Sequence, residues 1–327
     1  MADSHGSAGP GGDSSCCPRC DSPSYLILFR ASDYLYETEV RTFHVVECSV
    51  CRLMRLYPTP TADEVRSFYP ESYWWETDSS VSGRLAELYR QFVLGDHVQF
   101  ITRHGKLSAP VLDVGCGGGA FVRALIDRGV PAVGLDVSPV AASMARTEGH
   151  STVVRGALPF APFAPHSFSV VTLFHVLEHV PDPAALLLAI DDLLLPGGKL
   201  IVQVPNADSW QFLLLGKLWS GLDMPRHLIH FRAGDLESLL EGCGFTILRR
   251  KFFSLRDNPA SLATSLCPRL EPVVRRVRGL KESNSVRLLK DALYASLVVA
   301  AIPLTLVEAA SGAGATVMFE AMRTGEV

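Results

Sequence analysis

The stretch Pro110-Val-Leu-Asp-Val-Gly-Cys-Gly-Gly-Gly119 decides the fold of this chain. An apolar run ends in Asp113 and turns through alternating glycines into the helical pattern Phe121–Arg128. Glycines permit a tight strand-to-helix turn and let a ligand approach the backbone closely. The spacing D-x-G-x-G-x-G is neither the G-x-G-x-x-G of dinucleotide-binding folds nor a P-loop. Because Asp113 would repel a pyrophosphate, the stretch predicts a loop for a different kind of cofactor.

Predicted strands and helices alternate on both sides of this loop. A second apolar run, Ala132–Leu135, ends in Asp136, which is placed to accept hydrogen bonds from both hydroxyls of a ribose. Strands are predicted near residues 110–115, 131–136, 151–155, 168–174 and 198–204, and helices near 119–129, 138–147 and 182–194. Such alternation predicts an α/β fold with a doubly wound parallel sheet.

Further motifs narrow the family. They are Leu158-Pro-Phe160, Phe168-Ser-Val-Val171, His175-Val-Leu-Glu-His-Val-Pro-Asp-Pro183 and Leu195-Pro-Gly-Gly-Lys-Leu-Ile-Val202. In this order the chain resembles the class I S-adenosylmethionine-dependent methyltransferases over about residues 108–253. The resemblance implies a seven-stranded Rossmann-like sheet, with its sixth strand at Phe245–Phe253 and an inserted antiparallel seventh strand at Ala315–Met322.

The same resemblance implies S-adenosylmethionine as the cofactor and names the residues around it. They are Asp113, Gly115, Cys116, Gly117, Gly119, Asp136, Val137, Ala157, Leu158 and Phe174. The chain departs from the family at two places. The loop Arg155–Leu158 lacks the usual acidic residue near the adenine, and Ser169 replaces a common Asp. We therefore expect backbone groups near Ala157 and Leu158 to hold the adenine.

A polar cluster follows the predicted fourth strand. His175, Glu178 and His179 leave this strand at the edge of the sheet where ligands bind in open α/β folds. Three roles compete: a histidine as general base, a divalent-metal site like that of ubiquinone-type O-methyltransferases, or a purely structural cap. We list His175 and His179 as catalytic candidates and Glu178 as a substrate contact.

A second polar cluster, Asp223-Met-Pro-Arg-His-Leu-Ile-His230, follows the fifth strand. His227 is a third candidate base, and Asp223, Arg226 and His230 are candidate substrate contacts. The alternative is a structural ion pair between Asp223 and Arg226.

Five of the eight cysteines lie in the first 51 residues. Cys17-Pro-Arg-Cys20 and Cys48-Ser-Val-Cys51 are two C-x-x-C units separated by 27 residues. Two such turns supply four thiolates in the closed tetrahedral geometry of structural zinc. With short strands predicted at Tyr25–Arg30 and Thr42–Cys48, the pattern predicts a zinc ribbon, as in a subset of the methyltransferases. Surface cysteines without metal are the alternative.

Composition and pattern divide the chain as follows: 1–15 disordered, 16–58 zinc ribbon, 59–107 helical leader, and 108–327 catalytic domain with a helical insertion at 254–312. The net charge of −4 argues against a nucleic-acid partner. Residues 1–15 lack the apolar core of a signal peptide, so we expect a cytoplasmic protein.

The insertion contains the apolar segment Ala292–Val307, interrupted by Pro303. We expect it to be too short to span a bilayer and to be kinked or broken at Pro303, within a helical cover over the substrate side of the cleft. Packing on the core or against a second subunit, as in a homodimer, accounts for it better than lipid. A membrane-surface role beside Arg275, Arg276 and Arg278 is the alternative.

Together the motifs predict transfer of a methyl group to a hydroxyl or amine of a small molecule, a sugar or secondary metabolite. The alternatives are an RNA methyltransferase and a catalytically degenerate partner subunit. The [DN]-P-P-[FY] motif that clamps flipped bases is absent after the fourth strand, which reads Phe174-His-Val-Leu177.

Overall fold

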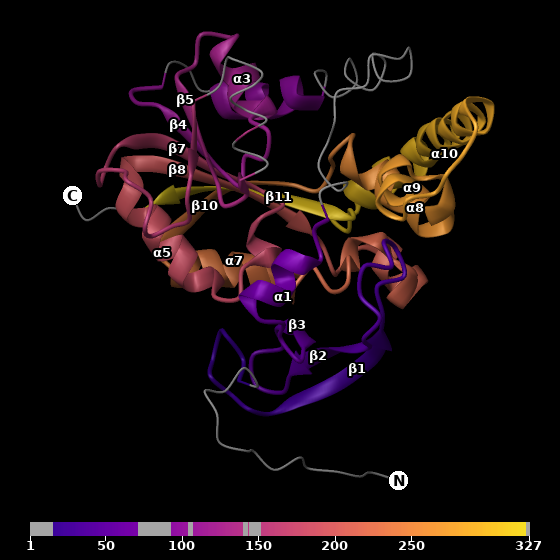
Figure 1. Cartoon of the computed structure of the whole chain (residues 1–327). Coiled ribbons are helices and arrows are strands. Elements are labelled where there is room, and N and C mark those ends of the chain that lie inside the picture. The colour runs from indigo at the N-terminus through magenta and orange to yellow at the C-terminus, as the bar shows by residue number, and fades with distance from the viewer. Residues whose placement is uncertain (1–15, 71–92, 104–106, 140–142, 144–151, 325–327) are drawn as a thin grey trace.

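The computed structural model describes residues 16–70, 93–103, 107–139, 143 and 152–324, and these form two sheets with their helices (Figure 1). The larger sheet has seven strands in the order β10-β11-β8-β7-β4-β5-β6. Their bounds are β4 Val111–Val114, β5 Ala132–Asp136, β6 Val153–Arg155, β7 Phe168–Phe174, β8 Leu194–Pro205, β10 Phe245–Lys251 and β11 Thr316–Arg323. Strand β11 is antiparallel to both of its neighbours, whereas the pairs among β4 to β8 are parallel. The predicted fold class, including the late antiparallel strand, is confirmed.

Helices cover both faces of this sheet. Figure 1 shows α5 (Pro183–Leu193) and α7 (Ala233–Gly242) on one face and α3 (Ala120–Ile126) on the other. The central strands β4 and β7 are buried along almost their whole length, as expected for parallel strands covered on both faces. Most of the helix predicted near 138–147 lies outside the described residues.

The smaller sheet is built mostly from the N-terminal segment. Its order is β1 (Tyr25–Ala31), β2 (Phe43–Cys48), β3 (Met54–Tyr57) and β9 (Ile229–His230). The short strand β9 comes from the segment after the fifth strand of the large sheet and pairs antiparallel with β3. The two predicted N-terminal strands therefore exist, but the catalytic segment supplies an edge of the same sheet. Helix α1 (Ala62–Ser67), which starts at a Thr61–Glu64 capping box, follows β3.

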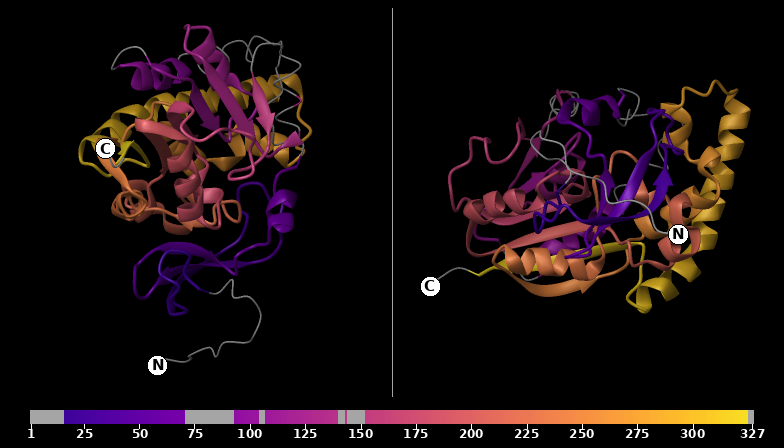
Figure 2. Two further views of the ribbon diagram at one scale, coloured as in Figure 1. Left: turned by 90° about the vertical axis from the view of Figure 1, so that its left-hand side faces the viewer. Right: turned by 90° about the horizontal axis from the view of Figure 1, so that it is seen from below.

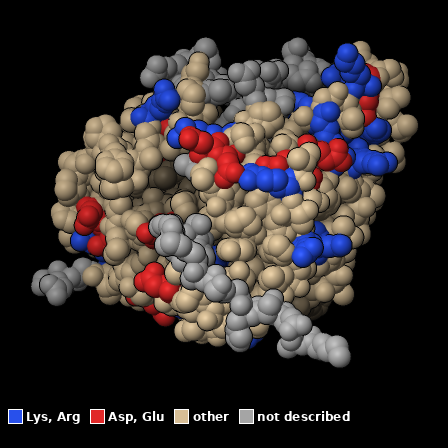
Figure 3. All heavy atoms as spheres, turned by 60° about the horizontal axis from the view of Figure 1, so that its bottom comes forward, with Lys and Arg blue, Asp and Glu red and all other residues tan. Residues whose placement is uncertain are grey.

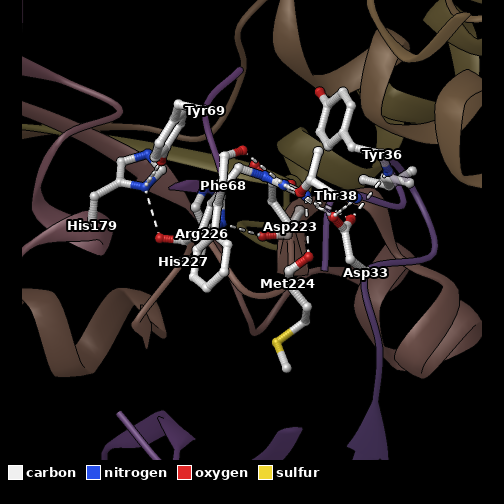
Figure 4. A network of polar contacts seen from close by, with 12 residues as sticks. Asp33, Tyr36, Thr38, Phe68, Tyr69, His179, Asp223, Met224, Arg226 and His227 are labelled. Atoms are coloured by element: carbon white, nitrogen blue, oxygen red, sulfur yellow. Dashed lines mark hydrogen bonds and ion pairs between the residues drawn. The ribbon is translucent and has the colours of Figure 1, made fainter. Parts of the chain in front are cut away.

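Arg226 connects the two sheets (Figure 4). Its guanidinium is completely buried and lies 2.8 Å from a carboxylate oxygen of Asp33 in the N-terminal segment and 2.8 Å from one of Asp223. It also donates to the Thr38 hydroxyl and lies 4.3 Å over the ring of Tyr36. Backbone carbonyls of Phe68 and Met224 accept the remaining bonds. A buried charge with this many partners fixes the N-terminal segment against the catalytic segment.

The electrostatics of this cluster agree with its geometry. Burial alone raises the pKa of the Asp33 carboxyl, but the hydrogen bonds and charge of Arg226 hold it below its usual value. The same carboxylate accepts bonds from the backbone of Tyr36 and from Thr38. Asp33 is therefore ionised and paired at neutral pH.

The segment between β10 and β11 is mostly helical, as predicted. It contains α8 (Asp257–Leu266), α9 (Pro272–Val277) and α10 (Asn284–Ala310). The expectation of a short helix broken at Pro303 is wrong, because α10 runs through Pro303 for 27 residues. Pro303 and Val299 are both exposed, so water can reach the Val299 carbonyl that proline leaves without its usual donor. By length and composition α10 could cross a membrane.

Replacing Arg226 by Ala is expected to lower the free energy of unfolding by about 3–5 kcal/mol, because it leaves two buried carboxylates without their countercharge. Urea unfolding followed by circular dichroism measures this loss.

The matched control is Arg66→Ala, which breaks an exposed pair with Asp63 and should cost at most about 0.5 kcal/mol. Equal effects of the two changes would contradict the connecting role of Arg226.

Candidate active site

The glycine loop leaves space beside its backbone. Gly115, Gly117 and Gly119 all have positive φ, which disfavours any other residue. A β-carbon on Gly115 would lie 2.4 Å from a methyl of Val176, so the loop packs closely against the chain leaving β7. Among the described residues, no atom lies within 4 Å of the β-carbon position at Gly117. That open side fits a bound cofactor.

Asp136 ends β5 beside this loop. One carboxylate oxygen accepts from the backbone N–H of Gly117 at 2.8 Å and the other from that of Ser138 at 2.7 Å. The next residue, Val137, is 67% exposed, which is unusual for an apolar side chain at a strand end. The fixed carboxylate of Asp136 suits hydrogen bonding to a ribose, and the exposed side chain of Val137 suits packing against an adenine ring. Ala157 and Leu158 follow the adjacent strand β6.

Asp113 has a different environment. It is buried, accepts a 2.6 Å hydrogen bond from the hydroxyl of Thr172 on β7, and has a pKa raised to about 7 by burial. Ser169, the departure from the family pattern, accepts from the backbone N–H of Ala109 at 2.6 Å. It therefore helps to fix the chain that leads into β4.

His175 lies between two carboxylates at the end of β7. Its Nδ1 is 3.2 Å from Glu178, and its Nε2 is 3.5 Å from Asp257 and 2.9 Å from the amide nitrogen of Gln203. Burial lowers its pKa, but the charges of Asp257 and Glu178 more than offset this and raise the pKa to about 10. Both ring nitrogens of His175 thus have protein partners, and a histidine without a free nitrogen is a poor general base. The geometry therefore favours a positioning role for His175.

The backbone at His175 is unusual. Its φ of 56° lies in the left-handed region, which is uncommon for a residue other than glycine. Such strained residues cluster at functional sites. The conformation directs the chain into the short 3-10 helix η2 (Leu177–His179), which carries the next two site residues.

Glu178, His179 and His227 come together, although His227 is distant in the sequence. One ligand atom from each residue lies within 4.8 Å of the other two. Nδ1 of His179 donates to the carbonyl of Arg226 at 2.9 Å, and Nδ1 of His227 lies 2.9 Å from the carbonyl of Gly221. Because a carbonyl only accepts, both histidines carry a proton on Nδ1.

Glu178 completes this group. It is 1% exposed, and one of its carboxylate oxygens lies 3.9 Å from Nε2 of His227. The other oxygen is buried and has no hydrogen-bond partner among the described residues. Burial and the nearby His179 lower the pKa of His227 well below its usual value. His227 is therefore unprotonated at Nε2 at neutral pH, which suits proton removal, and the three side chains together suit a divalent cation.

The second predicted cluster divides into two roles. The prediction that Arg226 contacts substrate is wrong, because its guanidinium is completely enclosed by protein partners. The alternative, an ion pair with Asp223, is correct. His230 lies buried in β9, where burial lowers its pKa to about 4. Only His227 turns toward Glu178, at 3.9 Å.

The structure adds residues that the sequence did not single out. Gln203 on β8 donates to Asp257 at 2.7 Å and contacts His97 at 3.2 Å, and the Tyr69 hydroxyl lies 3.0 Å from His179. These residues lie far apart in the chain. A polar Gln203 inside the apolar run of β8 was the one available signal.

The four cysteines of the C-x-x-C units converge at one end of the smaller sheet. Sulfurs of Cys17 and Cys51 lie 3.4 Å apart, those of Cys20 and Cys48 lie 3.5 Å apart, and all four are within 4.8 Å of one another. A Zn–S bond of ~2.3 Å places tetrahedral sulfurs roughly 3.8 Å apart. The four thiols fit zinc, and the site lies apart from the histidines.

The comparisons agree with this geometry. Residues 85–250 match the family model described as "Methyltransferase domain". This chain belongs to the class I S-adenosylmethionine-dependent methyltransferase family. The match includes the glycine loop, β5 to β8 and both histidine clusters.

Curated relatives include two proteins named ubiquinone biosynthesis O-methyltransferase. The one from Methylococcus capsulatus is 35% identical over 159 residues, covering 46% of this chain and 65% of its own length. The one from Stutzerimonas stutzeri is 30% identical over 170 residues, covering 49% and 70%. The chain thus spans about two thirds of the length of these relatives. The family-model match of residues 85–250 does not include the N-terminal sheet or the segment 254–312.

Solved structures show weaker likenesses. A methyltransferase from Archaeoglobus fulgidus is 18% identical with a TM-score of 0.48, covering 75% of this chain and all of that one. Magnesium protoporphyrin IX methyltransferase from Synechocystis PCC 6803 is 15% identical with a TM-score of 0.49, covering 80% and all of that chain. Likenesses of this size do not indicate a function, and the fold is established by the strand order of the large sheet.

Purified protein is expected to contain one equivalent of zinc, held by Cys17, Cys20, Cys48 and Cys51. Cys20→Ser should release most of it and lower the melting temperature, because loss of a ligand opens a closed four-sulfur site.

Metal analysis by plasma mass spectrometry checks this, with Cys267→Ser as the matched control. Metal content well under half an equivalent that Cys20→Ser leaves unchanged would contradict the zinc site.

Proposed function

We propose that this protein transfers the methyl group of S-adenosylmethionine to a hydroxyl oxygen of a small molecule. The carrying observation is the group of Glu178, His179 and His227. Its first two members follow β7, and Val176, just before them, packs against the glycine loop at Gly115. The curated relatives named O-methyltransferases support oxygen as the acceptor atom. A sugar or secondary metabolite remains our proposed acceptor class.

The cofactor would bind along the C-terminal ends of β4, β5 and β6. Asp136 would hold the ribose, the exposed side chain of Val137 would face the adenine, and the open side of Gly117 would accept the amino-acid end. When bound, S-adenosylmethionine supplies an electrophilic methyl group on a sulfonium. The protein then has to align the acceptor and remove its proton.

We assign proton removal to His227. Its Nδ1–H is fixed on the Gly221 carbonyl, so Nε2 is the acceptor, and its lowered pKa keeps that nitrogen unprotonated at neutral pH. Glu178, 3.9 Å away, would stabilise the imidazolium that forms. His175, held between Glu178 and Asp257, would position Glu178.

Other parts of the proposal concern compartment and partners. The reduced cysteine group suits the cytoplasm, where thiols bind metal more often than they pair. The closed four-sulfur geometry gives zinc a structural role. A nucleic-acid acceptor is disfavoured by the acidic net charge of −4.

Replacing His227 by Asn is expected to lower kcat roughly 10²–10⁴-fold, the usual contribution of a general base, while the Kd for S-adenosylmethionine changes little. The assay is methyl transfer from labelled cofactor to a panel of small hydroxyl acceptors, with cofactor binding measured by calorimetry. His44→Asn in β2 is the matched control and should keep full activity.

Two results would overturn this assignment. An unchanged kcat in His227→Asn would remove the base role. Loss of activity in EDTA, restored by Mg²⁺ while zinc stays bound, would instead make Glu178, His179 and His227 ligands of a divalent cation. Failure of the wild-type protein to bind S-adenosylmethionine at all would overturn the enzyme proposal itself.

A further inference from the structure

Most charged side chains of helix α10 contact the protein, whereas many of its apolar side chains face outward, the reverse of an ordinary surface helix. Figure 1 and the right-hand view of Figure 2 place it at one flank of the molecule, beyond α8. Three of its four charged side chains, those of Lys290, Asp291 and Glu308, are used in contacts with the protein. Asp291 pairs with Arg275, Lys290 lies 2.5 Å from Glu282, and the Glu308 carboxylate accepts from the side-chain amide of Gln211 at 3.0 Å. A surface helix of a soluble monomer normally turns such groups to water.

The opposite side of α10 is apolar and exposed. Only 17% of its most apolar eighteen-residue window is buried. The large exposed side chains along it are Val286, Leu288, Leu289, Leu293, Val299, Leu304, Leu306 and Val307. At 27 residues and ~1.5 Å per residue, the helix presents this face over about 40 Å. A continuous apolar surface of this size marks an interaction site.

The exposed apolar surface does not end with α10. The first turn of α6 (Trp210–Leu215) bonds to Glu308 near the C-terminal end of the helix. Near this contact the side chains of Leu213, Leu214 and Leu218 are exposed, and so is that of Lys217.

Basic residues accompany this surface. The segment 254–312 carries eight Lys and Arg against five Asp and Glu, a net charge of +3 in a chain whose total is −4. Of these, Arg269, Lys281 and Arg287 are exposed and have no ion-pair partner in the described part of the chain. Figure 3 shows Lys and Arg side chains, with Asp and Glu among them, at the upper right, above a broad surface with few charged atoms. An apolar face with flanking positive charge is complementary to an anionic lipid surface.

The helix is tied to the protein along most of its length. Besides the pairs of Lys290, Asp291 and Glu308, the Tyr294 hydroxyl lies 2.9 Å from that of Thr264 on α8. A helix spanning the bilayer would have to break these contacts. Its first residue would then lie on the opposite side of the membrane from β11, which follows its last residue. We propose that α10 lies in the plane of an anionic membrane surface, with its outward apolar face inserted among the lipids.

The test is flotation of the full-length protein with vesicles of phosphatidylcholine and phosphatidylglycerol at 7:3. The wild type should float, and vesicles of phosphatidylcholine alone should bind at least several-fold less. Leu289→Glu with Val299→Glu should reduce bound protein at least tenfold, because two exposed side chains on the inserted face become charged. Both positions are exposed, and unchanged binding of S-adenosylmethionine or an unchanged melting curve would show that this variant folds.

The matched control is Val40→Glu with Leu248→Glu, two exposed apolar positions away from α10, and it should float like the wild type. The proposal is overturned if the wild type stays in the aqueous fraction or if the α10 variant floats equally well. It is also overturned if light scattering shows a wild-type dimer that the α10 variant dissociates while no protein floats, because the face would then bind a second copy.

Discussion

The buried contact of Arg226 with Asp33 and Asp223 is the constraint on which the arrangement of this protein depends. It holds the N-terminal segment against the chain between β8 and β9, and one residue further on stands His227. The carbonyl of Arg226 itself accepts from His179. A single buried cation thus connects the cysteine-bearing sheet to the two histidines of the candidate active site. The short strand β9 reinforces the same connection through β3.

The candidate site has two parts, and the Arg226 contact bears on one of them. The cofactor side consists of the glycine loop and Asp136, which are held by bonds within the large sheet alone. The acceptor side depends on residues that meet from β7, the segment after β8 and the insertion, including Asp257 of α8. The N-terminal segment therefore contacts the residues beside the proposed acceptor side, and its sheet strands β1 to β3 lie outside the family-model match of residues 85–250.

Much of the fold was predictable because its signals are local. The D-x-G-x-G-x-G turn and the strand-end Asp136 each fix a short stretch of backbone. The seven-stranded sheet with its late antiparallel strand was implied by the family resemblance that these motifs carry. Strand β9 has two residues and no periodicity to detect. The approach of Asp257 to His175, and the burial of Arg226, arise from tertiary contacts between distant segments. Helix α10 was misjudged because Pro303 was expected to break it, whereas the helix continues through an exposed position.

The most direct test of this account is the substitution Asp33→Ala, which lies in the N-terminal segment and reaches the histidines only through Arg226. The Kd for S-adenosylmethionine and the kcat for methyl transfer should be measured on the same folded preparation. The account predicts that kcat falls at least tenfold while the cofactor Kd stays within twofold of the wild type. An unchanged kcat, or a loss of cofactor affinity as large as the loss of kcat, would contradict it.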